Sequence, residues 1–191
     1  MNLCKKHCKL LTHFINYNSI NKYYYSILFL GSDSFSLESL KILLHNKSKA
    51  HVDHIEVCSS SYENAIGKFC KQNQIPFSKW PDLERSKQFD VGVVSSFGHL
   101  ISSRIIKSCK LGMINVHGSL LPRWRGASPI QYAILNGDKI TGITLMKIHP
   151  KRFDVGEIIF QQQFEIPSRA TFKLLYENLA KIGAELVRRN E

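Results

Sequence analysis

The chain has 191 residues, a length that suits one domain with a short extension. Hydrophobic residues make up 43% of it, as in globular proteins, and no apolar run reaches the length of a transmembrane helix. The net charge of +11 favours a polyanionic partner or a basic leader, and the five cysteines match the spacing of no disulfide framework. These values argue against a disulfide-stabilised secreted domain and an integral membrane protein.

Residues 1–25 have the composition of a leader peptide. They contain four lysines and no acidic residue, so residues 26–191 keep 22 basic and 15 acidic side chains, a net charge of +7. Apolar side chains in this segment would share one face of a short helix, as in a mitochondrial transit peptide; a disordered basic tail is the alternative. We expect no metal site here, because no second ligand pair at zinc-finger spacing follows the group Cys4, His7, Cys8 and His13.

The remainder of the chain begins with a strand, a turn and a helix. Residues 26–31 form a short apolar run that ends at a glycine, which is the pattern of a buried strand. Asp33 then offers an N-cap for a helix with a leucine-rich face. The turn between them lacks the further glycines of a dinucleotide-binding fingerprint, and it is not a Walker loop.

Strands and helices continue to alternate after this unit. The hydrophobic pattern predicts strands over residues 51–59 and 90–96, a helix over 62–72 and an extended segment over 76–80. A further helix is expected to follow residue 96, with these side chains on its apolar face: Leu100, Ile101, Ile105 and Ile106.

Residues 113–126 place two polar side chains at the end of a strand. Ile114 and Val116 alternate with Asn115 and His117, so the amide and the imidazole share one face. In open α/β sheets, ligands bind at the carboxyl ends of the strands. An amide donor beside an imidazole can stabilise an oxyanion and move a proton at one carbonyl centre. A lone pair of this kind also fits a structural hydrogen bond at a sheet edge.

The C-terminal part completes the pattern. We expect a helix that starts at Ser128 and Pro129 and ends at Asn136-Gly137, strands over 141–148 and 157–164, and an amphipathic helix over 172–186. Strands thus alternate with helices throughout residues 26–191. This order predicts one doubly wound α/β domain with a mainly parallel, Rossmann-like sheet and an antiparallel strand pair near the C-terminal end.

Two stretches resemble a known enzyme family. The string Met-Ile-Asn-Val-His-Gly-Ser-Leu-Leu-Pro-Arg-Trp-Arg-Gly over residues 113–126 resembles the signature of the formyltetrahydrofolate-using formyltransferases. Its end, residues 120–126, is most similar to the methionyl-tRNA formyltransferases. The string Pro-Lys-Arg-Phe-Asp-Val-Gly over residues 150–156 resembles the mitochondrial branch of that family. The resemblance covers residues 26–191 and is strongest over residues 90–161.

The resemblance implies transfer of the formyl group of 10-formyltetrahydrofolate to the amino group of initiator methionyl-tRNA in the mitochondrial matrix, without a metal. It implies that Asn115 donates to the oxyanion, that protonated His117 donates beside it, and that Asp154 favours this protonated form and relays the amine proton. Without the resemblance, Asp154 would be interpreted as a solvated or turn-capping loop residue. We further expect a monomer. Family members carry a C-terminal tRNA-binding domain, and we expect none in the sequence up to Glu191.

The resemblance also assigns binding positions. It implies that the folate contacts are made by Gly98, His99, Leu100, Ile101, Ser119, Leu120, Leu121 and Pro122, although plain core packing explains Leu100 and Ile101 equally well. Arg123, Trp124 and Arg125 could meet a tRNA phosphate and a base, form a surface cluster, or clamp the carboxylates of the folate tail. The loop over residues 59–64 is short and nearly uncharged. At this position the family often carries a longer basic loop that touches the tRNA acceptor stem.

Two other functions fit the same residues. The implied catalytic residues are shared by enzymes that hydrolyse formyltetrahydrofolate or pass its formyl group to a different amine. A truncated product could instead bind folate or tRNA without catalysis. Measuring formylated tRNA and released folate in parallel separates these alternatives, because hydrolysis releases folate without formylating tRNA.

Overall fold

The computed structural model describes residues 25–45, 52–83 and 87–188. The predicted leader, with its cysteine and histidine group, lies outside the described residues except for Tyr25, which already belongs to the first strand. The strands are β1 (Tyr25–Gly31), β2 (Val52–Ser59), β3 (Phe77–Lys79), β4 (Val91–Ser95), β5 (Met113–His117), β6 (Ile140–Lys147) and β7 (Ile158–Glu165). The helices are α2 (Ser34–His45), α3 (Ala65–Gln72), α4 (Ser103–Lys107), α5 (Pro129–Leu135) and α6 (Phe172–Arg188).

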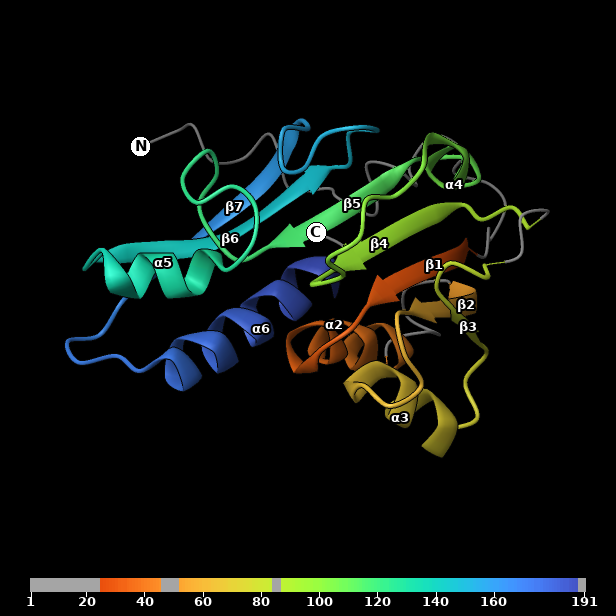
Figure 1. Ribbon diagram of the computed structural model, residues 1–191, viewed down its shortest axis with the longest axis horizontal. Coiled ribbons are helices and arrows are strands. Elements are labelled where there is room, and N and C mark those ends of the chain that lie inside the picture. The colour runs from red at the N-terminus through yellow and green to blue at the C-terminus, as the bar shows by residue number, and fades with distance from the viewer. Residues whose placement is uncertain (1–24, 46–51, 84–86, 189–191) are drawn as a thin grey trace, which may run out of the picture.

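The strands form a single sheet in the order β3-β2-β1-β4-β5-β6-β7 (Figure 1). Neighbouring strands from β3 to β5 are parallel, whereas β6 pairs antiparallel with both β5 and β7. Helices α2, α3 and α6 gather on one side of the sheet and α4 lies on the other (Figure 1). The predicted doubly wound, mainly parallel sheet with an antiparallel pair near the C-terminal end is therefore confirmed.

The central strand β1 contributes to a hydrophobic core on each face of the sheet. Ile27 and Phe29 pack with α2 and α6 in one core, and Leu28 and Leu30 pack into the other. Side chains alternate across a strand, so a continuous apolar run can serve both faces of a sheet that is covered on both sides. Burying each such side chain stabilises the fold by about 1.5–3 kcal/mol. Among the described residues, no helix is long and apolar enough to cross a membrane.

Asp90 connects the start of β4 to the start of β1. Its carboxylate accepts hydrogen bonds from the backbone N–H and the hydroxyl of Ser26, both at 2.8 Å, and from Lys110 Nζ at 3.1 Å. Burial raises the pKa of this carboxyl, but the hydrogen bonds from Ser26 and Lys110 outweigh it and hold the pKa below its ordinary value.

Three of the predicted helices differ in detail. Helix α3 begins at Ala65 instead of Tyr62, because the Asn64 side chain accepts from the backbone N–H of Gly67 and caps the helix. Helix α4 spans only Ser103–Lys107, so Leu100 and Ile101 lie in the preceding loop. The Ser128 position before α5 is left-handed, with φ of 59° and no capping hydrogen bond from its side chain.

The strand order reverses next to β1. The chain moves outward from β1 to β2 and β3, then crosses to β4 on the other side. Connections that leave in opposite directions open a crevice at the carboxyl ends of the two central strands, where ligands bind in sheets of this kind. Asp33 follows β1 and Ser96 follows β4, and the Ser96 hydroxyl donates to Asp33 Oδ2 at 2.7 Å. The other oxygen of Asp33 accepts from the Ser36 N–H and caps α2, as predicted.

Candidate active site

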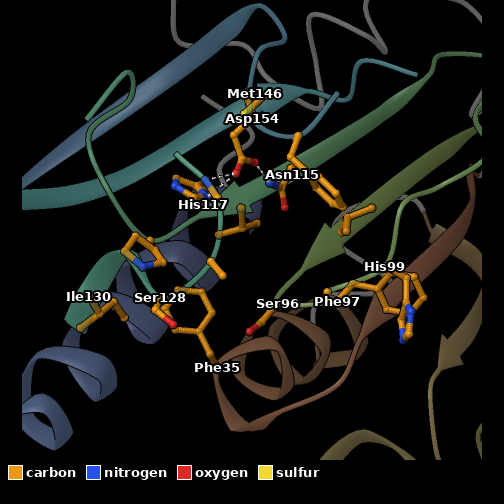
Figure 2. A pocket seen from close by; sticks show the side chains of 18 of the residues that line it. Phe35, Ser96, Phe97, His99, Asn115, His117, Ser128, Ile130, Met146 and Asp154 are labelled. Atoms are coloured by element: carbon orange, nitrogen blue, oxygen red, sulfur yellow. Dashed lines mark hydrogen bonds and ion pairs between the residues drawn. The ribbon is translucent and has the colours of Figure 1, made fainter. Parts of the chain in front are cut away.

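A cavity of about 670 Å³ opens at this crevice. Its walls come from the segments after β1 and β4, the end of β5, the residues before and within α5, and the loop between β6 and β7 (Figure 2). Its size falls within the roughly 300–1,000 Å³ range of small-molecule sites. Seven of the fourteen predicted site residues line this cavity, although they come from distant parts of the sequence.

Asn115, His117 and Asp154 lie together on the wall of the cavity (Figure 2). Asn115 and His117 share one face of β5, as their spacing predicted, while Ile114 and Val116 pack into the core. Asp154 reaches them from the loop after β6: Asn115 Nδ2 donates to Asp154 Oδ1 at 3.1 Å, and His117 Nδ1 lies 3.6 Å from Asp154 Oδ2. An amide donor, an imidazole and a carboxylate thus meet at one point.

The two nitrogens of the His117 ring have different neighbours. Nε2 lies 2.9 Å from the backbone carbonyl oxygen of Trp124, which can only accept a hydrogen bond. Nε2 therefore carries a proton, and Nδ1, which faces Asp154, is the nitrogen that can gain or lose one. His117 is only 6% exposed, so little of it faces water.

Asp154 is held in place by its backbone conformation and by Gly126. Its φ of 51° is left-handed, which costs on the order of 1–3 kcal/mol for a residue other than glycine and persists only where the surroundings enforce it. The backbone N–H of Gly126 donates to Asp154 Oδ2 at 2.8 Å. Two residues later, Gly156 packs so tightly on the backbone of β6 that a Cβ would overlap the Lys147 carbonyl oxygen. The loop is thereby pressed against the sheet.

The segment after β4 lines the cavity, and its predicted contact with folate stays a prediction. Gly98, His99, Leu100 and Ile101 all lie on its wall. Ile101 is 5% exposed and belongs to the core, whereas Leu100 is 52% exposed. Core packing therefore describes Ile101 well, and it does not explain Leu100.

The turn after β5 has a different place from the one expected. The residues Ser119, Leu120, Leu121 and Pro122 are absent from the cavity wall. The Ser119 hydroxyl donates to the Arg123 carbonyl at 2.6 Å, and the Thr144 hydroxyl donates to the Ser119 carbonyl at 2.6 Å. The Leu121 N–H in turn donates to the Thr144 hydroxyl at 3.0 Å. These contacts anchor the turn on β6, and the folate contact of the turn stays a prediction.

The side chains of Arg123 and Trp124 both donate hydrogen bonds to Asp138. Asp138, just before β6, receives hydrogen bonds from Arg123 Nε at 2.8 Å and Nη2 at 2.6 Å, and from Trp124 Nε1 at 2.7 Å. The Arg123 guanidinium lies 4.3 Å from the centre of the indole, and Trp124 stacks on Tyr132 of α5 with ring centroids 5.4 Å apart. This geometry matches the surface-cluster alternative for Arg123 and Trp124. Arg125 is exposed.

Sequence reasoning missed part of the cavity wall. Ser96, Phe97, Met146 and Ile148 also line it. The position of Ser96 directly after a predicted parallel strand was a usable signal, because the carboxyl ends of such strands meet at one edge. Met146 had no such signal, since its pairing opposite Asn115 is known only from the register of β5 and β6. No group of three metal-ligating side chains occurs in the part of the chain that the structure describes.

Residues 78–189 match the family model described as formyl transferase. The chain is 40% identical over 168 residues to the human mitochondrial methionyl-tRNA formyltransferase, which covers 84% of this chain and 43% of that relative. It is 34% identical over 175 residues to the methionyl-tRNA formyltransferase of a Wolbachia strain from Drosophila simulans, covering 84% of this chain and 58% of that relative. The chain thus spans about half the length of these relatives.

Solved structures share the fold. The phosphoribosylglycinamide formyltransferase of Bacillus halodurans superposes with a TM-score of 0.70 at 19% identity, over 87% of this chain and 97% of that one. A formyltetrahydrofolate deformylase from Pseudomonas syringae superposes with a TM-score of 0.71 at 20% identity, over 88% of this chain and 60% of that one. At these identities the likeness concerns the fold alone. The match of the family model over more than half of the sequence means that this chain belongs to the formyl transferase family.

Proposed function

We propose that this chain transfers the formyl group of 10-formyltetrahydrofolate to the amino group of initiator methionyl-tRNA, in the mitochondrial matrix, at the start of translation. The observation that carries the proposal is the convergence of Asn115, His117 and Asp154 on the wall of one cavity. Its support from outside the site is the identity with methionyl-tRNA formyltransferases, of which the first is mitochondrial.

The cavity suits a folate in size and in chemistry. Phe97, Ile101, Met146 and Ile148 offer apolar surface for a flat ring system. Asn115, His117 and Asp154 lie together on one part of the wall, so a folate whose formyl group reaches that part would meet all three. The three residues lie close enough to one another to act on a single carbonyl centre.

Each of the three residues has a distinct part in the proposed reaction. Bound 10-formyltetrahydrofolate supplies the formyl group on a nitrogen that can leave. Asn115 Nδ2 uses one N–H toward Asp154 and keeps a second to donate to the formyl oxygen as negative charge develops there. One such donor contributes about 10²–10³-fold in rate.

His117 and Asp154 handle the proton of the attacking amine. Nε2 of His117 is occupied by the Trp124 carbonyl, so Nδ1 is the nitrogen available for proton transfer. The neighbouring Asp154 carboxylate can receive the amine proton itself or through water, and His117 Nδ1 can pass a proton to the folate nitrogen as its bond to the formyl carbon breaks. Positioned acid–base groups of this kind contribute about 10²–10⁴-fold.

The test is formyl transfer by the full chain from 10-formyltetrahydrofolate to initiator methionyl-tRNA, with formylated tRNA and released folate measured in parallel. We expect formylated tRNA with the wild type and its loss in Asn115→Ala. The control variant is Glu185→Gln, which removes an exposed ion pair on α6 and leaves the cavity unchanged. Folate release without formylated tRNA would replace the proposal with hydrolysis or another acceptor. Absence of both products would contradict it.

A further inference from the structure

We infer that Asp138 is a positioning residue for His117. It acts through Trp124, whose backbone carbonyl fixes the proton of the imidazole on Nε2. The expected effect of Asp138 on turnover rests on the function proposed above. The contacts that carry it are present in the free protein and can be measured without substrate.

Asp138 lies outside the cavity wall and makes three hydrogen bonds to the turn after β5. Arg123 donates two of them, and Trp124 donates the third through its indole nitrogen. The hydrogen bonds from Arg123 hold the pKa of the Asp138 carboxyl below its ordinary value, and that from Trp124 acts in the same direction. An ionised carboxylate with all three donors in place ties the turn to the start of β6.

The indole of Trp124 contacts two further side chains besides Asp138. The Arg123 guanidinium covers one part of its surface at 4.3 Å, and the ring of Tyr132 stacks on it at an interplanar angle of 14°. With the ring restrained, the Trp124 backbone keeps a left-handed φ of 56°. Such a conformation needs enforcement by its surroundings, and here Asp138, Arg123 and Tyr132 provide it.

This conformation directs the Trp124 carbonyl at the imidazole. Its oxygen lies 2.9 Å from His117 Nε2, and the Ser119 hydroxyl contacts the preceding carbonyl, of Arg123, at 2.6 Å. A carbonyl cannot donate, so the ring holds its fixed proton on Nε2 and presents Nδ1 to Asp154. If Trp124 moves, His117 loses the group that selects its tautomer and its orientation.

The same geometry bears on the alternative that Arg123 and Trp124 recognise tRNA. Arg123 directs Nε and Nη2 at Asp138, and the indole donates its single N–H to the same carboxylate. Loss of a tRNA contact would raise the KM for tRNA. Loss of His117 positioning lowers kcat and leaves that KM unchanged, so the two roles predict different kinetic results.

The experiment compares the full-length wild type with Asp138→Ala, Trp124→Phe and the control Glu185→Gln. Glu185 accepts hydrogen bonds from Nε of Arg188 at 2.8 Å and from its Nη2 at 2.6 Å, the same two donor atoms that Arg123 directs at Asp138. The control therefore removes an equivalent arginine–carboxylate contact on α6, away from the site. Nitrogen-labelled histidine is followed by NMR, and the His117 signal is assigned by its loss in His117→Asn. We expect a slowly exchanging Nε2 proton in the wild type and the control. Exchange should be at least about tenfold faster in Asp138→Ala, with kcat lowered about 10- to 100-fold.

Trp124→Phe keeps an aromatic ring for stacking but has no indole donor for Asp138, so we expect a smaller change in the same direction. It also decides the question if Asp138→Ala does not fold. An unchanged His117 signal in Trp124→Phe, or in a folded Asp138→Ala, would overturn the inference. So would a raised KM for tRNA at unchanged kcat. If the wild type forms no formylated tRNA, the proposed function fails, while the NMR signal still decides the role of Asp138.

Discussion

Gly156 offers a sharp test of how the loop after β6 positions Asp154. In Gly156→Ala, the added Cβ would overlap the Lys147 carbonyl oxygen and lie 2.8 Å from its carbonyl carbon, whereas real Cβ contacts under 3.0 Å are essentially never seen. Both atoms belong to the backbone of β6, and the Lys147 N–H is also bonded to the Glu157 carbonyl at 2.9 Å. The contact cannot be relieved by a side-chain rotation, so the loop must move.

The size of the effect follows from the distances. Relieving the contact requires a shift of about 1 Å or more. Asp154 lies two residues away and holds the Gly126 N–H at 2.8 Å and Asn115 Nδ2 at 3.1 Å, contacts that do not survive such a shift. A misplacement of about 1 Å costs about 100-fold in rate, so we expect kcat for formyl transfer to fall by about that factor.

The assay is initial-rate formyl transfer, with thermal unfolding measured on the same samples. Gly112→Ala is the control, because Gly112 has a left-handed φ of 86° but nothing within 4 Å of its added Cβ. Gly112→Ala thus introduces a backbone strain that Gly156→Ala does not have, but no clash, and Gly112 directly precedes β5 at the end of the strand that is remote from the cavity. We expect it to lose some stability and to keep its kcat. A folded Gly156→Ala with wild-type kcat would refute the reasoning.

Three further predictions concern catalysis, acid stability and thiol reactivity. Asn115→Ala should lower kcat by about 10²–10³-fold with little change in thermal unfolding, and a wild-type kcat would contradict its role as oxyanion donor. The depressed pKa of Asp90 stabilises the protein above the pKa of the unfolded chain, and this contribution is lost as pH falls through the folded pKa. Asp90→Asn should therefore lower the free energy of unfolding by about 1.5–3 kcal/mol near neutral pH, with the difference shrinking in acid; a pH-independent difference in urea unfolding would contradict this. Burial raises the thiol pKa of Cys58 to about 12 and those of Cys70 and Cys109 to about 11, so peptide mapping after iodoacetamide treatment should find all three unlabelled until the protein is unfolded.

The order of strands and helices follows from local patterns in the sequence. The apolar run at residues 27–30 reads as a buried strand because alternate side chains serve both faces of a covered sheet. The shared face of Asn115 and His117 follows from the twofold period of a strand, which needs no knowledge of the rest of the fold. Such features depend on neighbours in sequence and are predictable to within a few residues.

Errors of local prediction arose where side chains compete with the backbone pattern. The apolar spacing of residues 62–72 suits a helix throughout, yet the Asn64 side chain caps the Gly67 N–H and starts α3 at Ala65. Leu100 and Ile101 have helical spacing with Ile105 and Ile106, but α4 begins only at Ser103, where the Ser102 hydroxyl accepts the Ile105 N–H. In each case a polar side chain accepts a backbone N–H in the first turn of the helix and so fixes where the helix begins. The hydrophobic period does not locate that position.

The sequence by itself determined the order of elements and the pair on β5, and, through the resemblance, the choice of Asp154. Only the tertiary structure decided that Asp154 reaches Asn115, 39 residues away, and that Asp138 accepts hydrogen bonds from Arg123 and Trp124 in a surface cluster. It also turned Ser119 and Leu121 toward β6 and away from the cavity. The physical reason is that these contacts depend on the antiparallel pairing of β6 with β5, whose register is set by long-range packing and carries no local period.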